Sequence, residues 1–335
     1  MSNKRQVFYN CNLYGAVPVS VSVYSLLRSA DPSQPLQVYV AHDSGFEENG
    51  GREQVRSVVD RFPFASVTFL NFEPIYRKHA DVLDCELNQW SPMVWALCFF
   101  PDLIPDITGN LVFLDWDTFV FRDLAELYGM DLSDGNWIEA AVSESPREHR
   151  PYLIAAGWPE AAGCSINYGV QVIDTDAYRR ERVKDRMLEW YARNRDIAVC
   201  AEQDSLNVVC GDRIRRLPVK YNFYASWLDR MPKHNPFDPK WRIHATRDVL
   251  DGAANPAIVH FIGHKKPWNK GYRSFRREYR RAMRDLGLLH GNIPGEGPVF
   301  RFFGIFADAY HDLMRKYAAL QLRLLYRRPA ENHVR

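Results

Sequence analysis

The feature that most constrains how this chain folds is the alternation of short apolar runs with helical stretches along its first third. The runs at 6–10, 36–41 and 67–70 have the length and residue types of β-strands, and helical stretches at 17–29 and 51–61 separate them. Strands joined through a helix pair in parallel, because the crossover returns the chain to the end from which it started. The pattern therefore predicts an α/β fold that opens as βαβαβ with a mainly parallel sheet.

The expected alternation continues well beyond this opening. The apolar run 111–114 has no polar interruption, which is typical of a strand buried on both faces of a sheet. We expect a helix over 91–100 before this strand, one long helix over 176–193, and a loop rich in Pro and Trp over 225–256. Further strands are expected at 138–142 and 170–173, and basic helix after residue 260.

Composition excludes several classes of protein. The chain has 335 residues, 46% of them hydrophobic and 25% charged. We therefore expect a globular protein whose core is large enough to fold without disulfides or a structural metal. No secretion signal is visible, and no run of about 18 apolar residues is long enough to span a bilayer. The six cysteines include no close pair, which suits a reducing cytoplasm. We therefore expect a cytoplasmic protein that can still lie peripherally on the inner face of the membrane.

Charge is divided unevenly along the chain. From His264 to the end there are 16 Lys or Arg residues against 6 Asp or Glu, whereas residues 1–263 hold 27 against 35. The net charge of +2 therefore hides an acidic body and a basic tail. A cationic cluster attracts the phosphates of lipid headgroups, nucleotides or nucleic acid, and the alternative is a solvated basic helix with no partner.

Two carboxylates directly follow the apolar run 111–114. Asp115 and Asp117 stand at the expected end of a buried strand, where they repel each other unless a cation neutralises them. Hard carboxylate oxygens favour Mg²⁺ or Mn²⁺, and an ion held by few protein groups keeps positions for a diphosphate. The alternative is a structural Asp turn in which Asp117 caps a helix.

Two other segments carry polar groups at the ends of expected elements. His260 ends an apolar run, and Gly263 and Lys266 follow it. This segment offers an imidazole for a metal and an ammonium group for phosphate. Glu202 and Asp204 lie at an expected helix start, where the alternative is that they only favour the helix dipole.

Taken in this order, these segments resemble the family 8 glycosyltransferases, which have the GT-A fold and are related to glycogenin and to bacterial lipopolysaccharide α-galactosyltransferases. The resemblance extends over roughly residues 6–268. It implies a Rossmann-like nucleotide-sugar-binding fold with a mainly parallel central sheet, a catalytic domain over 1–268, and a basic, aromatic helical tail over 269–335. The motifs that carry it are 24–27 in the first helix, 115–117, 134–137, 167–173, 203–207 and 260–268.

The resemblance also implies roles for individual residues. Asp115, Asp117 and His260 match the family's ligands for Mn²⁺ or Mg²⁺, which is bridged to the diphosphate of the donor. The positions expected to bind the donor are Asn10, Asn12, Asp115, Asn167, Gly263 and Lys266. The candidate catalytic residues are Glu202, Gln203 and Asp204, of which the first two match the carboxylate and amide beside the anomeric carbon, with Glu202 replacing the family's usual Asp.

Two positions depart from the family pattern. Cys11 stands in the opening strand where the family usually has an Asp that reads the nucleoside. Leu97 stands where the family usually carries an arginine that helps to place the donor, and its side chain cannot bind phosphate or sugar oxygens. The alternative to an active enzyme is therefore a catalytically impaired sugar-nucleotide-binding protein of the same fold.

The resemblance implies metal-dependent transfer of a hexose from a UDP-sugar to an acceptor hydroxyl, with retention at the anomeric carbon. The expected acceptor is a glycan or a lipid-linked saccharide, as in lipopolysaccharide or polysaccharide biosynthesis. A hydrophobic strand followed by Asp-x-Asp also opens the haloacid-dehalogenase phosphatases, but in those a Gly and then Thr or Val follow the second Asp. Here Thr118 and Phe119 follow it, which fits poorly.

The basic tail predicts one helix with an apolar seam, because its large apolar residues recur at alternating steps of three and four. Three interpretations remain open: docking on an anionic membrane face, pairing with a second copy, and packing on the protein's own body. Nucleic-acid binding is not expected, since no recognised module accompanies the charge. The seam is Phe303, Phe306, Tyr310, Leu313, Tyr317, Leu320 and Leu324, and cations cluster at Arg315, Lys316, Arg323, Arg327 and Arg328.

Overall fold

The structure is a computed structural model that describes residues 5–83, 91–143, 150–158, 165–230, 244–271, 273–291 and 293–325. The chain divides into two compact units. The first unit comprises Met1–Thr118 and Asp123–Leu217, and the second comprises Phe119–Arg122 and Pro218–Arg335. The expected end of the catalytic domain at residue 268 stays a prediction.

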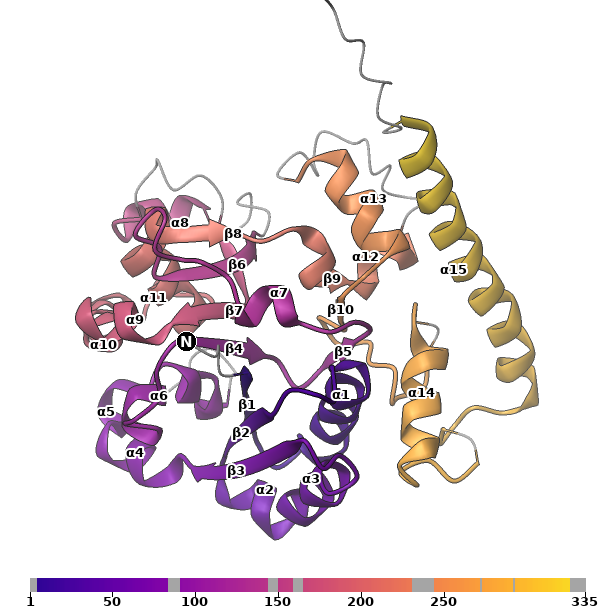
Figure 1. Cartoon of the computed structure of the whole chain (residues 1–335), viewed down its shortest axis with the longest axis horizontal. Coiled ribbons are helices and arrows are strands. Elements are labelled where there is room, and N and C mark those ends of the chain that lie inside the picture. The colour runs from indigo at the N-terminus through magenta and orange to yellow at the C-terminus, as the bar shows by residue number, and fades with distance from the viewer. Residues whose placement is uncertain are drawn as a thin grey trace, which may run out of the picture. The chain divides into compact units, whose positions relative to one another are not determined.

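The first unit is built on a seven-stranded sheet with the order β3-β2-β1-β4-β7-β6-β8 (Figure 1). Strands β3, β2, β1 and β4 are parallel neighbours, β7 runs antiparallel to both β4 and β6, and β8 is parallel to β6. The mainly parallel α/β sheet is thus confirmed. The strands are β1 (Arg5–Cys11), β2 (Leu36–His42), β3 (Ala65–Asn71), β4 (Asn110–Leu114), β6 (Glu139–Ser143), β7 (Ile166–Asp174) and β8 (Ile214–Arg216).

The register of the central strands decides which side chains share an edge. Phe8 of β1 pairs with Phe113 of β4, so Asn10 is level with Asp115, two residues further along each chain. The antiparallel pairing of Leu114 with Val170 brings Gly169 next to Asp115. The carboxyl ends of β1 and β4 and the start of β7 therefore meet at one edge of the sheet, where open α/β sheets bind ligands.

Helices pack around this sheet and bury its apolar strands. Helix α1 (Ala16–Ser29) buries an apolar stripe that includes Val19, Val23 and Leu26, as its helical periodicity predicts. The other helices of the unit are α2 (Ser44–Glu48), α3 (Gly51–Val59), α4 (Glu73–Lys78), α5 (Ala80–Leu83), α6 (Phe100–Leu103), α7 (Ala125–Tyr128), α8 (Arg150–Ala155), α9 (Thr175–Arg180), α10 (Val183–Asn194) and α11 (Ala201–Cys210), with 3₁₀ turns η2 (Pro92–Leu97) and η4 (Gly211–Arg213).

The single helix expected over 91–100 is wrong. The chain forms the 3₁₀ turn η2 and then the separate helix α6. Proline explains the break, because Pro101 has no N–H to donate to the carbonyl four residues earlier.

The single helix expected over 176–193 is also wrong, since the structure has α9 and α10. The break falls at Arg182, whose φ of 51° is left-handed. Arg179 ties α9 to the carbonyls of Ile104 and Ile107. Helix α10 instead buries Val183 and Met187 in the apolar core, so the two segments need different directions.

The second unit contains a three-stranded sheet with the order β5-β10-β9. The loop expected over 225–256 is wrong in part, because helices occupy both ends of it and residues 231–243 lie outside the described ones. No described helix combines the length and apolarity needed to cross a bilayer. The elements are β5 (Thr118–Val120), η5 (Val219–Tyr221), β9 (Phe223–Tyr224), α12 (Ala225–Arg230), α13 (Thr246–Ala254), β10 (Ile258–His260), α14 (Arg276–Asp285) and α15 (Pro298–Leu325).

Candidate active site at the carboxyl end of the sheet

The Asp115-x-Asp117 segment is a tight turn directly after β4. The backbone N–H of Asp115 donates to the carbonyl of Gly169 at 2.8 Å. The carbonyl of Asp115 accepts from the N–H of Thr118 at 3.2 Å and from its Oγ1 at 2.8 Å. Asp117 is buried and Asp115 half-buried. The turn thus presents two carboxylates from a backbone that neighbouring strands hold in place.

Thr118 anchors this turn further through a buried chain of hydroxyl groups. Its Oγ1 lies 2.9 Å from Ser22 Oγ of α1, and Ser22 Oγ lies 3.2 Å from the hydroxyl of Tyr9 in β1. Sequence reasoning missed these residues. The sequence did offer one signal for them. Ser22 lies on the apolar face of α1, and a buried hydroxyl group needs a hydrogen-bond partner.

Two of the expected sugar-facing residues support the adjoining backbone of β7. Asn167 Oδ1 accepts from the N–H of Gly169 at 3.0 Å, and Gln203 Oε1 accepts from the N–H of Tyr168 at 3.0 Å. The Gln203 bond ties the start of α11 to β7. The structure therefore brings Asn167 and Gln203 to the same edge of the sheet as Asp115.

The two acidic residues at the start of α11 differ in their surroundings. Asp204 Oδ2 accepts from the N–H groups of Val199 and Cys200 at 2.7 and 2.9 Å, so its carboxylate braces the loop before the helix. The pKa of Glu202 is raised to about 8, first by burial and then by the negative charges of Asp115 and Asp204. Glu202 thus lies in the field of the Asp115 carboxylate and is mostly protonated at neutral pH.

The opening strand supplies two asparagines at different depths. Asn10 is buried, and its Nδ2 donates to the carbonyl of Met93 at 2.9 Å. Asn12 forms an exposed turn in which its Oδ1 accepts from the N–H of Tyr14 at 3.0 Å. Cys11 between them is buried, and burial, followed by the charges of Asp43 and Asp115, raises the pKa of its thiol. A neutral thiol cannot replace a carboxylate that reads a nucleoside.

Leu97 belongs to the apolar core of the first unit. It is buried in the same cluster as Phe113 and Tyr168. The surroundings of this position are therefore apolar, and they suit Leu97 better than the charged arginine that the family usually has there.

In the second unit, His260 is held by a buried side chain that sequence reasoning missed. His260 Nδ1 lies 3.0 Å from Asn222 Oδ1, and both residues are buried. With the Asn222 oxygen as acceptor, Nδ1 carries the proton and Nε2 is left with its lone pair. Asn222 lies in a segment with no motif, so no sequence signal pointed to it.

The segment after β10 has the backbone and charge expected of a phosphate contact. Gly263 is exposed and has a φ of 84°, a conformation that favours glycine. Lys266 Nζ donates to the carbonyl of Phe261 at 2.9 Å and lies 5.8 Å from the centre of the Trp268 ring. The ammonium group is therefore held close to the end of β10.

Strand β5 directly follows the Asp-x-Asp turn along the chain and is the sheet neighbour of β10, which ends at His260. The N–H of Phe121, directly after β5, donates to the carbonyl of Ala257, directly before β10, at 2.8 Å. Within the described ranges, one ligand atom from each of Asp115, Asp117 and His260 lies within 4.8 Å of the others. Two carboxylates and one imidazole fit a divalent cation with positions left for ligand oxygens.

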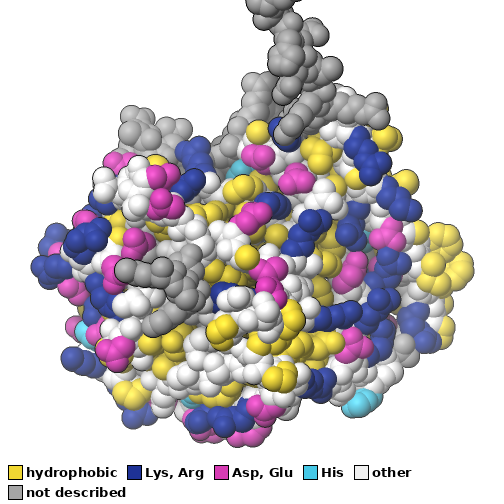
Figure 2. Space-filling model, in the orientation of Figure 1, with side chains coloured by type: hydrophobic (Ala, Val, Ile, Leu, Met, Phe, Trp, Pro, Cys, Tyr) yellow, Lys and Arg dark blue, Asp and Glu magenta, His cyan; other side chains and the backbone are white. Residues whose placement is uncertain are grey.

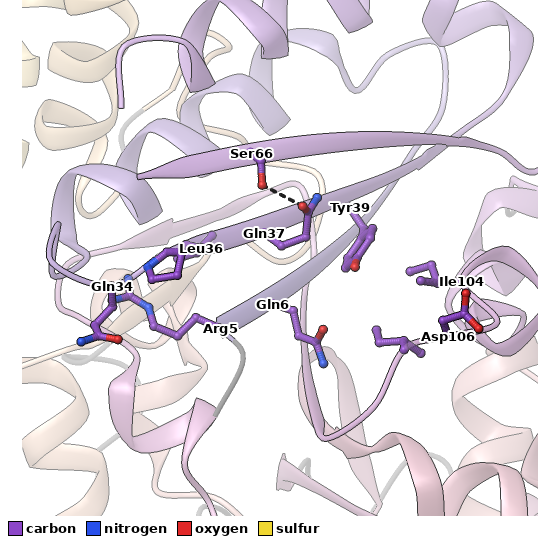
Figure 3. Close-up of a pocket in the computed structure, with 11 residues that line it drawn as sticks. Arg5, Gln6, Gln34, Leu36, Gln37, Tyr39, Ser66, Ile104 and Asp106 are labelled. Carbon is purple, nitrogen blue, oxygen red and sulfur yellow. Dashed lines mark hydrogen bonds between the residues drawn. The ribbon is translucent and has the colours of Figure 1, made fainter. Parts of the chain in front are cut away.

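A separate cavity lies at the opposite edge of the seven-stranded sheet, where β1 and β2 begin. Figure 3 shows the side chains of Gln6, Gln37 and Tyr39 around it, with Asp106 beyond. Its volume is about 440 Å³, and none of the expected site residues lines it. The candidate site is therefore defined by the polar groups at the other edge.

The comparisons with known proteins agree with this fold. A family model described as "Glycosyl transferase family 8" matches residues 6–271. The chain is 24% identical over 263 residues to General stress protein A of Bacillus subtilis (strain 168), which covers 77% of this chain and 86% of that protein.

Two solved structures share the fold at low sequence identity. The galactosyltransferase LgtC in complex with donor and acceptor sugar analogs has a TM-score of 0.65 and 20% identity, covering 87% of this chain and 98% of LgtC. The bifunctional glycosyltransferase WbbM has a TM-score of 0.62 and 17% identity, covering 92% of this chain and 52% of WbbM. The expected GT-A fold is confirmed.

Proposed function

Because the chain belongs to glycosyl transferase family 8 and is a glycosyltransferase, we propose that it moves a hexose from a UDP-sugar to an acceptor hydroxyl with retention at the anomeric carbon. The observation that carries the proposal is the group formed by Asp115, Asp117 and His260, whose chemistry suits a cation bound to a diphosphate. The family membership also removes the haloacid-dehalogenase alternative.

Asp115, Asp117 and the Nε2 atom of His260 are the proposed ligands for Mn²⁺ or Mg²⁺. When bound, the cation supplies positive charge beside the diphosphate leaving group. Asn222 is a positioning residue, since its bond to Nδ1 fixes the ring and the tautomer of His260. Lys266 and the backbone at Gly263 add contacts to phosphate oxygens.

The first unit supplies the proposed contacts to the nucleoside and the sugar. Asn10 and Asn12 contact the base or ribose, and Asn167 contacts the donor sugar. The ionised form of Glu202 and the amide of Gln203 steady the positive charge that develops at the anomeric carbon. Asp204 holds the loop before α11, the helix that carries both residues. The proposed acceptor is a glycan or lipid-linked saccharide, used at the inner face of the membrane by a cytoplasmic protein.

One observation favours an impaired sugar-nucleotide-binding protein as the second candidate. The two positions that depart from the family, Cys11 and Leu97, are both buried without charge. Such a protein would bind UDP with manganese but would not release the sugar from a donor.

Nucleotide release from a panel of donors, measured with and without manganese, tests the proposal. The panel contains UDP-glucose, UDP-galactose, their N-acetyl forms and GDP-mannose, because slow hydrolysis needs no acceptor. We expect manganese-dependent release of UDP from at least one donor. UDP binding without release from any donor or acceptor supports the second candidate, and release that ignores manganese contradicts the metal site.

A further inference from the structure

Helix α15 is arranged with its polar side toward the protein. Gly304, His311 and Ala318 recur every seven residues and are buried on one face. This face lies against α12 and α13. His311 Nε2 is 3.4 Å from Asp229 of α12, and the buried Gly304 leaves room for Arg276. The apolar seam that the sequence predicts therefore does not hold the helix to the rest of the unit.

Ion pairs attach this polar side to α14. Arg276 pairs with Asp308 at 2.8 Å, and Arg315 pairs with Glu278 at 3.1 Å. A further pair joins Arg277 to Asp312. Both acidic residues of α15, Asp308 and Asp312, are thus engaged by arginines of α14.

The opposite side of α15 is an exposed apolar stripe. With 3.6 residues per turn, its members fall within a sector of roughly 100° that extends for about 40 Å. Figure 2 shows hydrophobic side chains with basic ones beside them along the edge that α15 occupies in Figure 1. The stripe is Val299, Phe302, Phe303, Phe306, Leu313, Tyr317, Leu320 and Leu324, which are between 41% and 71% exposed.

Charge distinguishes between the partners that could cover this stripe. The exposed charged residues of α15 are all cationic: Arg301, Lys316 and Arg323. In a symmetric pair of these helices the cations beside the stripe would face each other and repel. An anionic lipid surface attracts the same cations, while Phe and Tyr settle at the level of the headgroups.

We propose that α15 docks on an anionic lipid surface and lies in the plane of that surface, with the stripe from Val299 to Leu324 turned toward the acyl chains. The polar side remains bound to α12, α13 and α14. Arg327 and Arg328, expected to add charge, lie outside the described residues. This inference goes beyond the proposed reaction and does not depend on it.

Flotation of the full chain with lipid vesicles tests the inference. We expect the chain to float with phosphatidylcholine vesicles that contain phosphatidylglycerol, more weakly with phosphatidylcholine alone, and less as salt is added. Replacing Phe302, Phe303 and Phe306 together by Ser is expected to lower partition onto anionic vesicles by at least about tenfold. Absence of flotation, or flotation that this variant leaves unchanged, overturns the proposal.

Two further variants separate the contribution of charge from that of exposed apolar side chains. Lys316→Gln with Arg323→Gln should weaken binding to anionic vesicles and leave the weaker binding to phosphatidylcholine unchanged. Tyr152→Ser in α8 removes a ring that is 53% exposed outside the stripe, and should bind like the parent chain. Donor hydrolysis should be the same in all variants, so loss of vesicle binding is distinguishable from loss of the proposed reaction.

Sedimentation velocity without vesicles tests whether the stripe instead binds a second copy of the chain. We expect a monomer over the concentrations used for flotation. A dimer that the three Phe→Ser changes dissolve would assign the stripe to self-association and overturn the lipid assignment.

Discussion

Strands β4 and β10 both end in candidate metal ligands, but they hold those ligands by different means. After β4, the Asp115-x-Asp117 turn is fixed by backbone hydrogen bonds to Gly169 and Thr118. After β10, the ring of His260 is held by a side-chain hydrogen bond to Asn222, and the Tyr224 ring lies edge-on to it with the ring centres 5.9 Å apart. Backbone bonds survive most substitutions, whereas a side-chain bond is lost with one. The two ends should therefore respond differently to mutation.

Removing a ligand should have the largest effect. Asp117→Asn keeps the shape but loses the charge, and we expect turnover to fall roughly 100- to 1,000-fold, as for other groups that stabilise transition-state charge. Manganese-dependent nucleotide release measures it. Asp106→Asn, an exposed acid beside the cavity at the other edge of the sheet, is the control and should retain full activity. Equal rates in the two variants would exclude Asp117 from metal binding.

Removing the support of His260 should come next. Asn222→Ala leaves the imidazole in place but frees its orientation and tautomer, so we expect manganese affinity to fall about 10- to 100-fold. The manganese concentration that gives half-maximal release should rise, while the rate at saturating metal changes less. An altered rate with unchanged metal dependence would contradict the positioning role.

The titration of Glu202 predicts how activity depends on pH. Its pKa of about 8 means that the carboxylate fraction grows as pH rises from 7 to 9, so activity that needs this carboxylate should rise over that interval. A cation beside Asp115 lowers this pKa and moves the rise to lower pH. Glu202→Gln should lower the rate and flatten the profile. A variant profile that still rises in parallel with the parent's would assign the titration elsewhere.

The raised pKa of Glu202 also predicts how the stability of the protein changes with pH. In metal-free protein, the folded Glu202 keeps its proton up to about pH 8, whereas the unfolded chain loses it near the ordinary value of 4.5. The folded state therefore binds more protons between these values, and the free energy of unfolding should fall as pH rises through them. Urea unfolding of Glu202→Gln should show a weaker decline over this range.

The smallest effect is expected at the β4 turn. Thr118→Val removes the Oγ1 bonds to Asp115 and Ser22, which should cost about 1–3 kcal/mol of stability. Activity should fall only a few-fold, because the N–H bond of residue 118 remains. Thr68→Val is the control, at an exposed position of β3 where the Thr68 hydroxyl accepts a solvent-exposed hydrogen bond from Gln37; it should stay within about 0.5 kcal/mol of the parent. A loss of activity as large as that of Asp117→Asn would show that the turn depends on side chains after all.

Much of the fold and of the candidate site was predictable, because the sequence signals for both are local. Apolar runs located β1, β2 and β4, and the polar residues after β4 and β10 identified Asp115, Asp117 and His260. The break at Arg182 had no such signal, since neither Gly nor Pro marks it. The role of Asn222 could not be predicted either. It lies in a segment with no motif, and only the structure shows that its side chain bonds to His260.

The sequence by itself determined the strands, the order of the motifs and the heptad-like spacing of α15, because each depends on the chemistry and periodicity of neighbouring residues. Tertiary structure alone decided which way α15 faces and which side chain holds His260. Periodicity shows that a helix has an apolar side but carries no information on where that side points. That direction depends on ion pairs with distant residues such as Arg276 and Glu278, which form only after the chain has folded.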